Sequence, residues 1–210
     1  NGVEIEQSIP DSKFKIPNSK FKIIFVGRLS RQKDPLLLLK GFNDISQELK
    51  EKSEVLIIGD GKKRKELERF IKKNQLEEKV KLLGEVSREN VFESLKESHI
   101  FVLTSNWEGF PRTILEAMSC GLAIIASDVG GVKEAIDKNC GILVKRGDKE
   151  GLKIALEKLL KNPDIIFFMG KNARDRVREK FSLEKMLGET EKVYLEVLNK
   201  NNFNFNKLWN

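Results

Sequence analysis

The 210-residue sequence contains a single histidine, His99, and two cysteines, Cys120 and Cys140. One histidine, placed just before an apolar run, all but excludes a Ser/His/Asp mechanism or a His-based metal centre, and His99 is interpreted as structural. The two cysteines show neither CxxC nor Cys/His spacing. Neither a metal site nor a disulfide framework is therefore indicated, and a reducing cytosol is favoured.

Long apolar runs and a complete glycine fingerprint are also missing. The sequence shows no signal peptide and no apolar stretch near the ~20 residues of a membrane-spanning helix. The stretch GDGKKR at 59–64 has Arg64 where a dinucleotide-binding GxGxxG fingerprint needs its third glycine, which argues against a nicotinamide cofactor. Gly59 still permits the backbone to approach a ligand closely.

The bulk composition is that of a soluble globular protein, with 40% hydrophobic and 34% charged residues. The formal net charge of +7 favours an anionic partner, such as phosphate, nucleotide, nucleic acid or an acidic membrane surface. Many lysines nevertheless stand beside glutamates on predicted helix faces, as in KKRKELERFIKK, which is typical of ordinary solvated helices. Charge alone does not choose among these partners.

Short apolar runs alternate with amphipathic stretches along the chain. Continuous rather than alternating apolar residues are typical of strands buried on both faces, as in a parallel sheet covered by helices. The predicted strands are 22–27, 54–61, 79–85, 99–105, 122–128 and 141–145. The predicted helices are 35–50, 63–74, 88–98, 112–120, 132–138, 149–161, 164–180 and 183–200. This order predicts an α/β fold: a Rossmann-like doubly wound parallel sheet with helices on both faces and C-terminal helices appended.

Three segments are predicted from the composition along the chain. Residues 1–20 are polar and contain proline, and are interpreted as a linker; residues 21–200 form the Rossmann-like domain. Residues 201–210 are an Asn-rich tail, for which fraying and docking are both open. The sequence opens on NGVEIEQ without an initiator methionine, so we expect it to come from the interior of a longer protein.

The loops after the strands carry the candidate site, because ligands of doubly wound sheets bind beyond the carboxyl ends of the strands. After the first strand, Gly27 is followed by Arg28 and Lys33, two cations that can clamp a pyrophosphate; solvated charges are the alternative. Glu85 and Val86, at the end of the third strand, can offer backbone groups to a nucleobase.

Paired glycines in SDVGGVKE, after the fifth predicted strand, allow two interpretations. Free amides at the start of the following helix can hold an anion. A plain strand-to-helix turn capped by Asp128 is the favoured interpretation.

The stretch NWEGFPRTILEAMSCG at 106–121 brings two carboxylates near one another. We take Pro111 as the first helical residue, so that Glu116 lies in the second turn and Glu108 on the loop that enters the helix. A carboxylate can accept hydrogen bonds from two vicinal sugar hydroxyls. The amides of residues 110–113, at the helix N-terminus, suit a phosphate. This one segment can therefore grip both the sugar and the phosphate of a nucleotide sugar.

These motifs resemble the C-terminal, nucleotide-sugar-binding half of the retaining family 4 glycosyltransferases of GT-B fold. The family's E-x7-E element appears as EGFPRTILEAMSCGLAIIASDVGG and its phosphate loop as FVGRLSRQKDP. The opening NGVEIE is similar to the stretch after the family's interdomain crossover. Ala123 departs from the family, which often has proline after CGL.

The resemblance implies a role for each matching residue. Arg28 and Lys33 match the basic pair that binds the donor diphosphate. Glu108 matches the glutamate that contacts the transferred sugar and stabilises the site of reaction, and Glu116 the one that holds the ribose hydroxyls. The expected catalytic residues are Glu108, Arg28 and Lys33. The expected donor-binding residues are Gly27, Arg28, Lys33, Gly59, Glu85, Val86, Glu108, Gly109, Phe110, Pro111, Arg112, Thr113 and Glu116. No metal and no cofactor is expected.

The resemblance also implies substrates and surroundings. We expect a hexosyltransferase that moves a sugar from a nucleotide sugar, with UDP as our choice of nucleotide. The expected acceptor is a glycan or a lipid-linked glycan in glycan, lipopolysaccharide, capsule or glycolipid biosynthesis. The N-terminal acceptor domain of such enzymes is absent from this sequence, so we expect the chain alone to bind donor without catalysing transfer. A cytoplasmic location is expected, with peripheral association at the inner membrane face left open.

Two alternatives stay open. A GT-B-like sugar-nucleotide epimerase half would share nucleotide binding but not transfer, and the pairing of E-x7-E with GRLSRQK argues against it. A non-catalytic anion- or nucleic-acid-binding domain would use the net charge of +7. The sequence shows no aromatic–basic interleaving and no recognised nucleic-acid module, so no nucleic-acid partner is expected.

Overall fold

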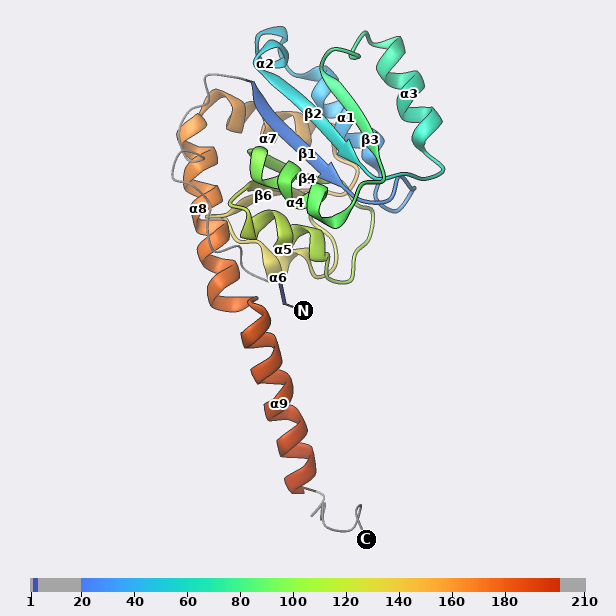
Figure 1. The fold of residues 1–210 in the computed structure, drawn as a ribbon. Coiled ribbons are helices and arrows are strands. Elements are labelled where there is room, and N and C mark those ends of the chain that lie inside the picture. Colours follow the sequence, from blue (N-terminus) through green and yellow to red (C-terminus); the bar gives the residue numbers. More distant parts are fainter. Residues whose placement is uncertain (1, 4–19, 201–210) are drawn as a thin grey trace.

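The computed structural model describes residues 2–3 and 20–200, whose centre is a parallel sheet with helices on both faces (Figure 1). The strands of this sheet are β1 (Phe21–Val26), β2 (Ser53–Ile58), β3 (Val80–Gly84), β4 (Ile100–Leu103), β5 (Ala123–Ser127) and β6 (Gly141–Val144). They lie in the order β3-β2-β1-β4-β5-β6, and each neighbouring pair is parallel. This order confirms the predicted doubly wound fold.

The helices follow the predicted order, with two corrections. They are α1 (Pro35–Asp44), α2 (Gln47–Glu51), α3 (Arg64–Lys73), α4 (Arg88–Glu97), α5 (Arg112–Ser119), α6 (Val132–Ala135), α7 (Lys149–Lys161), α8 (Pro163–Lys180) and α9 (Leu183–Lys200). The single helix predicted over 35–50 and the end predicted at 138 are both wrong. Ile45 and Ile136 directly follow α1 and α6 in extended conformation, and both are buried. Core packing of a β-branched side chain interrupts the helix in each case.

The sheet buries both of its faces because side chains alternate along each strand. On β1, Ile23 and Phe25 belong to one hydrophobic core, and Ile24 and Val26 to the other. Helices α1, α3 and α7 cover the first core, and α4, α5 and α6 cover the second. Fully burying such a side chain stabilises the fold by about 1.5–3 kcal/mol. Because helices cover both faces of the sheet, the loops at the strand ends are the expected positions for ligand binding.

Helix α8 joins the two cores at the edge of the domain. Ile166 and Met169 lie in the first core, whereas Ala173 and Val177 lie in the second. Gly170 permits this position, since a Cβ atom there would lie 2.1 Å from the carbonyl oxygen of Gly121. Beyond α8, the orange-red helix α9 extends away from the α/β body (Figure 1).

The first described residues pack where α8 meets α9. Val3 is buried and pairs with Ser182; its amide donates to the oxygen of Phe181, and its own oxygen accepts from the amide of Leu183. The start of the predicted linker is therefore hydrogen-bonded to the junction between α8 and α9. The rest of that linker, residues 4–19, and the predicted tail, 201–210, lie outside the described residues.

We expect Gly170→Ala to lower the free energy of unfolding by about 1–3 kcal/mol, because the new methyl group meets backbone that cannot turn aside. Gly188→Ala in α9 is the matched control. A Cβ atom at Gly188 has nothing within 4 Å, so alanine there should add about 0.5–1 kcal/mol through helix propensity. Urea titration of both variants measures the two shifts, and equal midpoints would contradict the packing role of Gly170.

Candidate functional site

The candidate site lies between the ends of β1 and β4, where the strand order reverses. The loop after β1 and the loop after β4 are hydrogen-bonded to each other. The Asn106 amide donates to the oxygen of Gln32 (2.7 Å), and its side-chain Nδ2 donates to the oxygen of Arg31 (2.7 Å). Thr104 Oγ1 donates to the oxygen of Asp34 (2.8 Å). These bonds fix the two loops against one another, and the sequence analysis named none of the donors.

A buried ion pair joins the two loops at the centre of the site. Lys33 Nζ lies 2.6 Å from Glu108 Oε1, with the two side chains only 19% and 7% exposed. Ser105 Oγ donates to the same oxygen at 2.5 Å. The structure thus brings together two of the predicted residues. It adds Ser105, which the sequence signals only through its place at the end of a buried strand.

Gly130 and Gly131, which follow β5, pack closely against the backbone of the loop that contains Glu108. A Cβ atom at Gly130 would lie 1.9 Å from the oxygen of Glu108, and one at Gly131 would lie 2.2 Å from the oxygen of Gly109. The Gly131 amide also donates to that Gly109 oxygen (2.8 Å). The predicted capping by Asp128 is wrong: Gly131 is the N-cap of α6, and Asp128 pairs instead with Lys133.

Glycine also sets the spacing of the loops after β1 and β2. Gly59 has φ +126°, and a Cβ atom there would lie 2.2 Å from the oxygen of Gly27. The Arg28 side chain beside this contact is exposed and forms no ion pair with any residue that the structure describes. Arg64, at the position of the missing third glycine, is paired with Asp60 at 3.1 Å.

A hollow of about 460 Å³ at the end of β1 and the start of α5 is lined by part of the predicted set. Its lining is Val26, Val86, Arg88, Val91, Phe92, Arg112, Thr113 and Glu116. Glu85 is exposed and is not part of this lining. The Arg88 guanidinium lies over the Phe92 ring, 5.8 Å from its centroid, a pair that the sequence analysis missed.

Thr113, in the wall of this hollow, has a buried side-chain hydroxyl. Its Oγ1 atom has no hydrogen-bond partner among the described residues. Buried hydroxyls are rarely left unpaired, and such a group costs about 1–3 kcal/mol. An unpaired buried hydroxyl in the wall of a hollow is a candidate point of ligand contact.

The turn into α5 differs from the expected geometry at Pro111. Pro111 is extended and forms the N-cap, so the prediction that it is the first helical residue is wrong; α5 begins at Arg112. Glu116 still falls in the second turn. The Phe110 side chain packs against Phe181, with ring centroids 5.6 Å apart.

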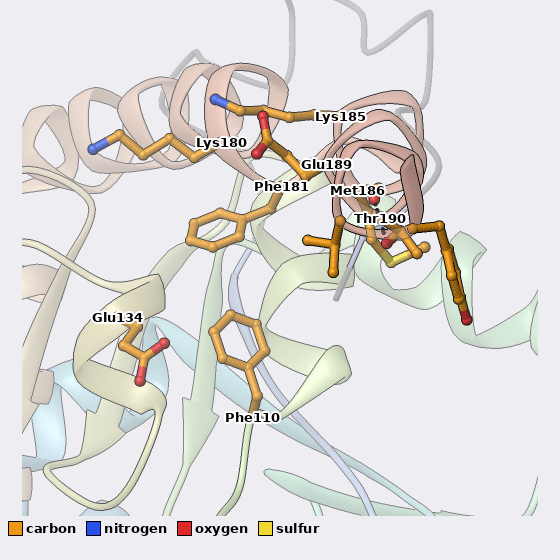
Figure 2. Close-up of a pocket in the computed structure, with 10 residues that line it drawn as sticks. Phe110, Glu134, Lys180, Phe181, Lys185, Met186, Glu189 and Thr190 are labelled. Atoms are coloured by element: carbon orange, nitrogen blue, oxygen red, sulfur yellow. Dashed lines mark hydrogen bonds between the residues drawn. The ribbon is translucent and has the colours of Figure 1, made fainter. Parts of the chain in front are cut away.

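Phe110 lines a second groove, of about 680 Å³, between this turn and α9. Figure 2 shows the rings of Phe110 and Phe181 facing one another, with Met186 and Thr190 of α9 closing the groove on one side. The groove is therefore separate from the hollow that contains Glu116.

The remaining special residues are structural. His99 Nδ1 accepts a hydrogen bond from the amide of Lys22, and its ring meets Phe21 edge to face, as expected for a structural histidine. Cys120 and Cys140 are buried thiols. Burial raises the pKa of the Cys140 thiol to about 11, so the reactive thiolate is rare near neutral pH.

The described ranges, 2–3 and 20–200, contain no group of three or more His, Cys, Asp and Glu side chains placed to hold a metal ion. None of their helices is long and apolar enough to cross a lipid bilayer.

The doubly wound sheet and its helices have the architecture of a Rossmann-like half of a GT-B fold. The family model for glycosyl transferases group 1 matches residues 7–178, and the chain belongs to this family. The chain is 34% identical over 207 residues to an uncharacterised glycosyltransferase of Methanocaldococcus jannaschii, which covers 94% of the chain and 52% of that relative.

Another relative and a solved structure have more specific names. The UDP-Gal:alpha-D-GlcNAc-diphosphoundecaprenol alpha-1,3-galactosyltransferase of Escherichia coli is 33% identical over 212 residues, covering 94% of this chain and 53% of its own length. The crystal structure of Anabaena HepE in complex with UDP-glucose superposes with a TM-score of 0.76 and 22% identity, over 84% of this chain and 49% of that one. The chain spans about half the length of the curated relatives it matches.

We expect Thr113→Val to raise the free energy of unfolding by about 1 kcal/mol, because it removes a buried hydroxyl that has no partner. Thr104→Val is the matched control. It removes the hydroxyl that donates to the oxygens of Lys33 and Asp34, and should lower stability by about 1–3 kcal/mol. Opposite shifts in urea midpoint support this assignment, and a loss in both variants contradicts it.

Asp34 gives a prediction on pH. Burial raises the pKa of this carboxyl, although Lys40 and Lys63 act against the shift. A raised folded-state pKa means that the charged form is disfavoured in the fold, so stability is lost as pH rises through that value. Asp34 has φ +42°, which asparagine also adopts readily. Asp34→Asn should therefore be more stable than the parent at pH 7.5, with the gain disappearing toward pH 3.5. A pH-independent difference in urea midpoint would contradict this.

Proposed function

We propose that the chain is the donor-binding domain of a retaining glycosyltransferase that transfers a sugar from a UDP-sugar. The product is a glycan, lipopolysaccharide, capsule or glycolipid. The buried Lys33–Glu108 pair at the switch point carries this proposal. Removing charges from water is costly, so an ion pair enclosed within a loop crevice suggests a site for a charged ligand. Membership of the glycosyl transferases group 1 narrows the ligand to a sugar donor.

The diphosphate is assigned to the loop after β1 and the start of α5. Lys33 and the exposed Arg28 supply positive charge, and the amides near Arg112 and Thr113 are helix N-terminal donors without helical acceptors. The nucleoside diphosphate gains negative charge as the glycosidic bond breaks. Fixed cations and amides stabilise that charge without a metal ion.

The nucleoside is assigned to the hollow of about 460 Å³. In this proposal, Glu116 accepts hydrogen bonds from the two ribose hydroxyls, and the backbone at Val86 contacts the base. The unpaired hydroxyl of Thr113 belongs to a residue that lines the same hollow. A hydroxyl or phosphate oxygen of the donor would satisfy it.

The sugar is assigned to Glu108. Breaking the bond between the anomeric carbon and the diphosphate oxygen gives an oxocarbenium-like centre, which a nearby carboxylate stabilises. The departing diphosphate keeps the bonding electron pair. The acceptor oxygen then bonds to the anomeric carbon from the same face, so the configuration is retained, and the acceptor proton passes to the departing phosphate.

Relatives support the choice of substrates. The Anabaena structure was solved with UDP-glucose, and the E. coli relative is named for UDP-Gal and a diphosphoundecaprenol-linked sugar. A UDP-sugar donor and a lipid-linked glycan acceptor are therefore our proposals for the whole enzyme. Cytoplasmic location and peripheral membrane association stay predictions.

A further domain is proposed to supply the acceptor site. Relatives are about twice as long as this chain. Helix α9 extends beyond the domain body (Figure 1), and it carries several exposed apolar side chains. These side chains are Leu187, Val193, Tyr194, Leu195 and Val197. We expect the 210-residue chain alone to bind donor and not to transfer sugar.

The nucleic-acid alternative is weakened by the arrangement of the charges. Several helix lysines pair with glutamates one turn away, as Lys52 does with Glu48 and Lys161 with Glu157. Such pairs leave a solvated surface rather than an unopposed basic face.

Calorimetric titration with UDP, GDP and ADP tests the proposal. We expect UDP to bind the unmodified chain, and Arg28→Ala and Glu116→Ala each to weaken binding about tenfold or more. That loss corresponds to about 1.4 kcal/mol, typical of a hydrogen bond to a charged group. Arg178→Ala, an exposed position in the last turn of α8, is the charge-matched control and should bind like the parent.

Binding that survives both substitutions would place the nucleotide elsewhere on the chain. Binding of GDP or ADP in preference to UDP would correct the nucleotide and leave the site intact. If none of the three nucleotides binds at millimolar concentration, the assignment of this half as an independent donor-binding domain is wrong.

A further inference from the structure

Two donors converge on one oxygen of Glu108. Lys33 Nζ and Ser105 Oγ both bond to Oε1, at 2.6 and 2.5 Å. Among the described residues, none donates a hydrogen bond to the other oxygen, Oε2. One half of the carboxylate is thus fixed by the protein, while the other half is available to a ligand.

Lys33 serves two partners in the proposed function, and it cannot hold both equally well. In the structure its ammonium is paired with Glu108, whereas the donor diphosphate requires the same charge. A nucleoside diphosphate carries more negative charge than a carboxylate and therefore draws Lys33 toward itself. Glu108 would then be buried without its cation, which is unfavourable for a carboxylate that is only 7% exposed.

We propose that Ser105 is a positioning residue, which keeps Glu108 hydrogen-bonded and oriented when the donor diphosphate draws Lys33 away. This role rests on the proposed function. Ser105 is fully buried and directly follows the loop-bonded Thr104 at the end of β4, so its hydroxyl stays in place whatever Lys33 does. A hydrogen bond from a fixed hydroxyl offsets part of the cost of the carboxylate losing its cation.

The neighbours of Ser105 show that its bond is distinct. Thr104 and Asn106, on either side, donate their side-chain hydrogen bonds to backbone oxygens of the loop after β1. Ser105 donates instead to a side-chain carboxylate. Thr104 and Asn106 thus hold the loop, and Ser105 holds the Glu108 carboxylate.

A double-mutant cycle on UDP binding tests this role, with GDP and ADP titrated alongside. Ser105→Ala should weaken nucleotide binding about tenfold, because releasing Lys33 now leaves Glu108 with no donor. Glu108→Gln removes the buried charge, so the nucleotide should bind at least as tightly as to the parent. In the Glu108→Gln background, Ser105→Ala should change affinity by about twofold or less, because no stranded charge remains.

Ser53→Ala is the structural control. Ser53 is equally buried and donates to a backbone oxygen, that of Leu49, at the start of β2. It should leave nucleotide affinity unchanged, and urea titration checks that all variants remain folded.

The outcomes separate the two proposals. If Ser105→Ala weakens nucleotide binding by the same factor in the parent and in the Glu108→Gln variant, Ser105 has a general structural role. That result would overturn the inference. Unchanged affinity of Ser105→Ala would overturn it as well. A parent chain that binds none of the three nucleotides would instead overturn the proposed function on which the inference rests.

Discussion

The adjacency of β1 and β4 is the constraint on which the site depends. These strands are far apart in sequence, yet they pair in parallel through Ile23–Ile100 and Ile24–Phe101. Parallel pairing places both carboxyl ends at the same edge of the sheet. Lys33 and Glu108, which follow these two strands, consequently meet in a crevice that buries them. With another strand order the same residues would be solvated charges on separate loops.

Close backbone approach is the second physical requirement of this region. The loops after β1, β2, β4 and β5 touch through backbone atoms, and a side chain at Gly59, Gly130 or Gly131 would collide with a carbonyl oxygen. Such contacts allow only small displacements. The glycines thus serve the site by letting the loop that carries Glu108 rest on a rigid support, independently of any contact they make with a ligand.

Electrostatics links this geometry to the proposed chemistry. An ion pair within the protein holds the Lys33 and Glu108 side chains in place. When an anionic donor binds, Lys33 exchanges one anionic partner for another. The free-energy cost of desolvating an unpaired cation is thereby reduced. Preorganised charge of this kind favours the separation of a nucleoside diphosphate from its sugar, because little reorganisation is needed as charge develops.

The sequence by itself determined the strand and helix order, the family resemblance and the position of the candidate loops. Continuous apolar runs such as that of β1 have one stable environment, and E-x7-E with its phosphate loop is a specific pattern. Tertiary structure alone decided where α1 and α6 end, because Ile45 and Ile136 are buried, and that Asp128 pairs with Lys133 rather than capping α6. It also decided the bonds of Ser105 and Thr104 and the unpaired hydroxyl of Thr113. Each depends on atoms brought together across the sheet, which local propensity does not encode.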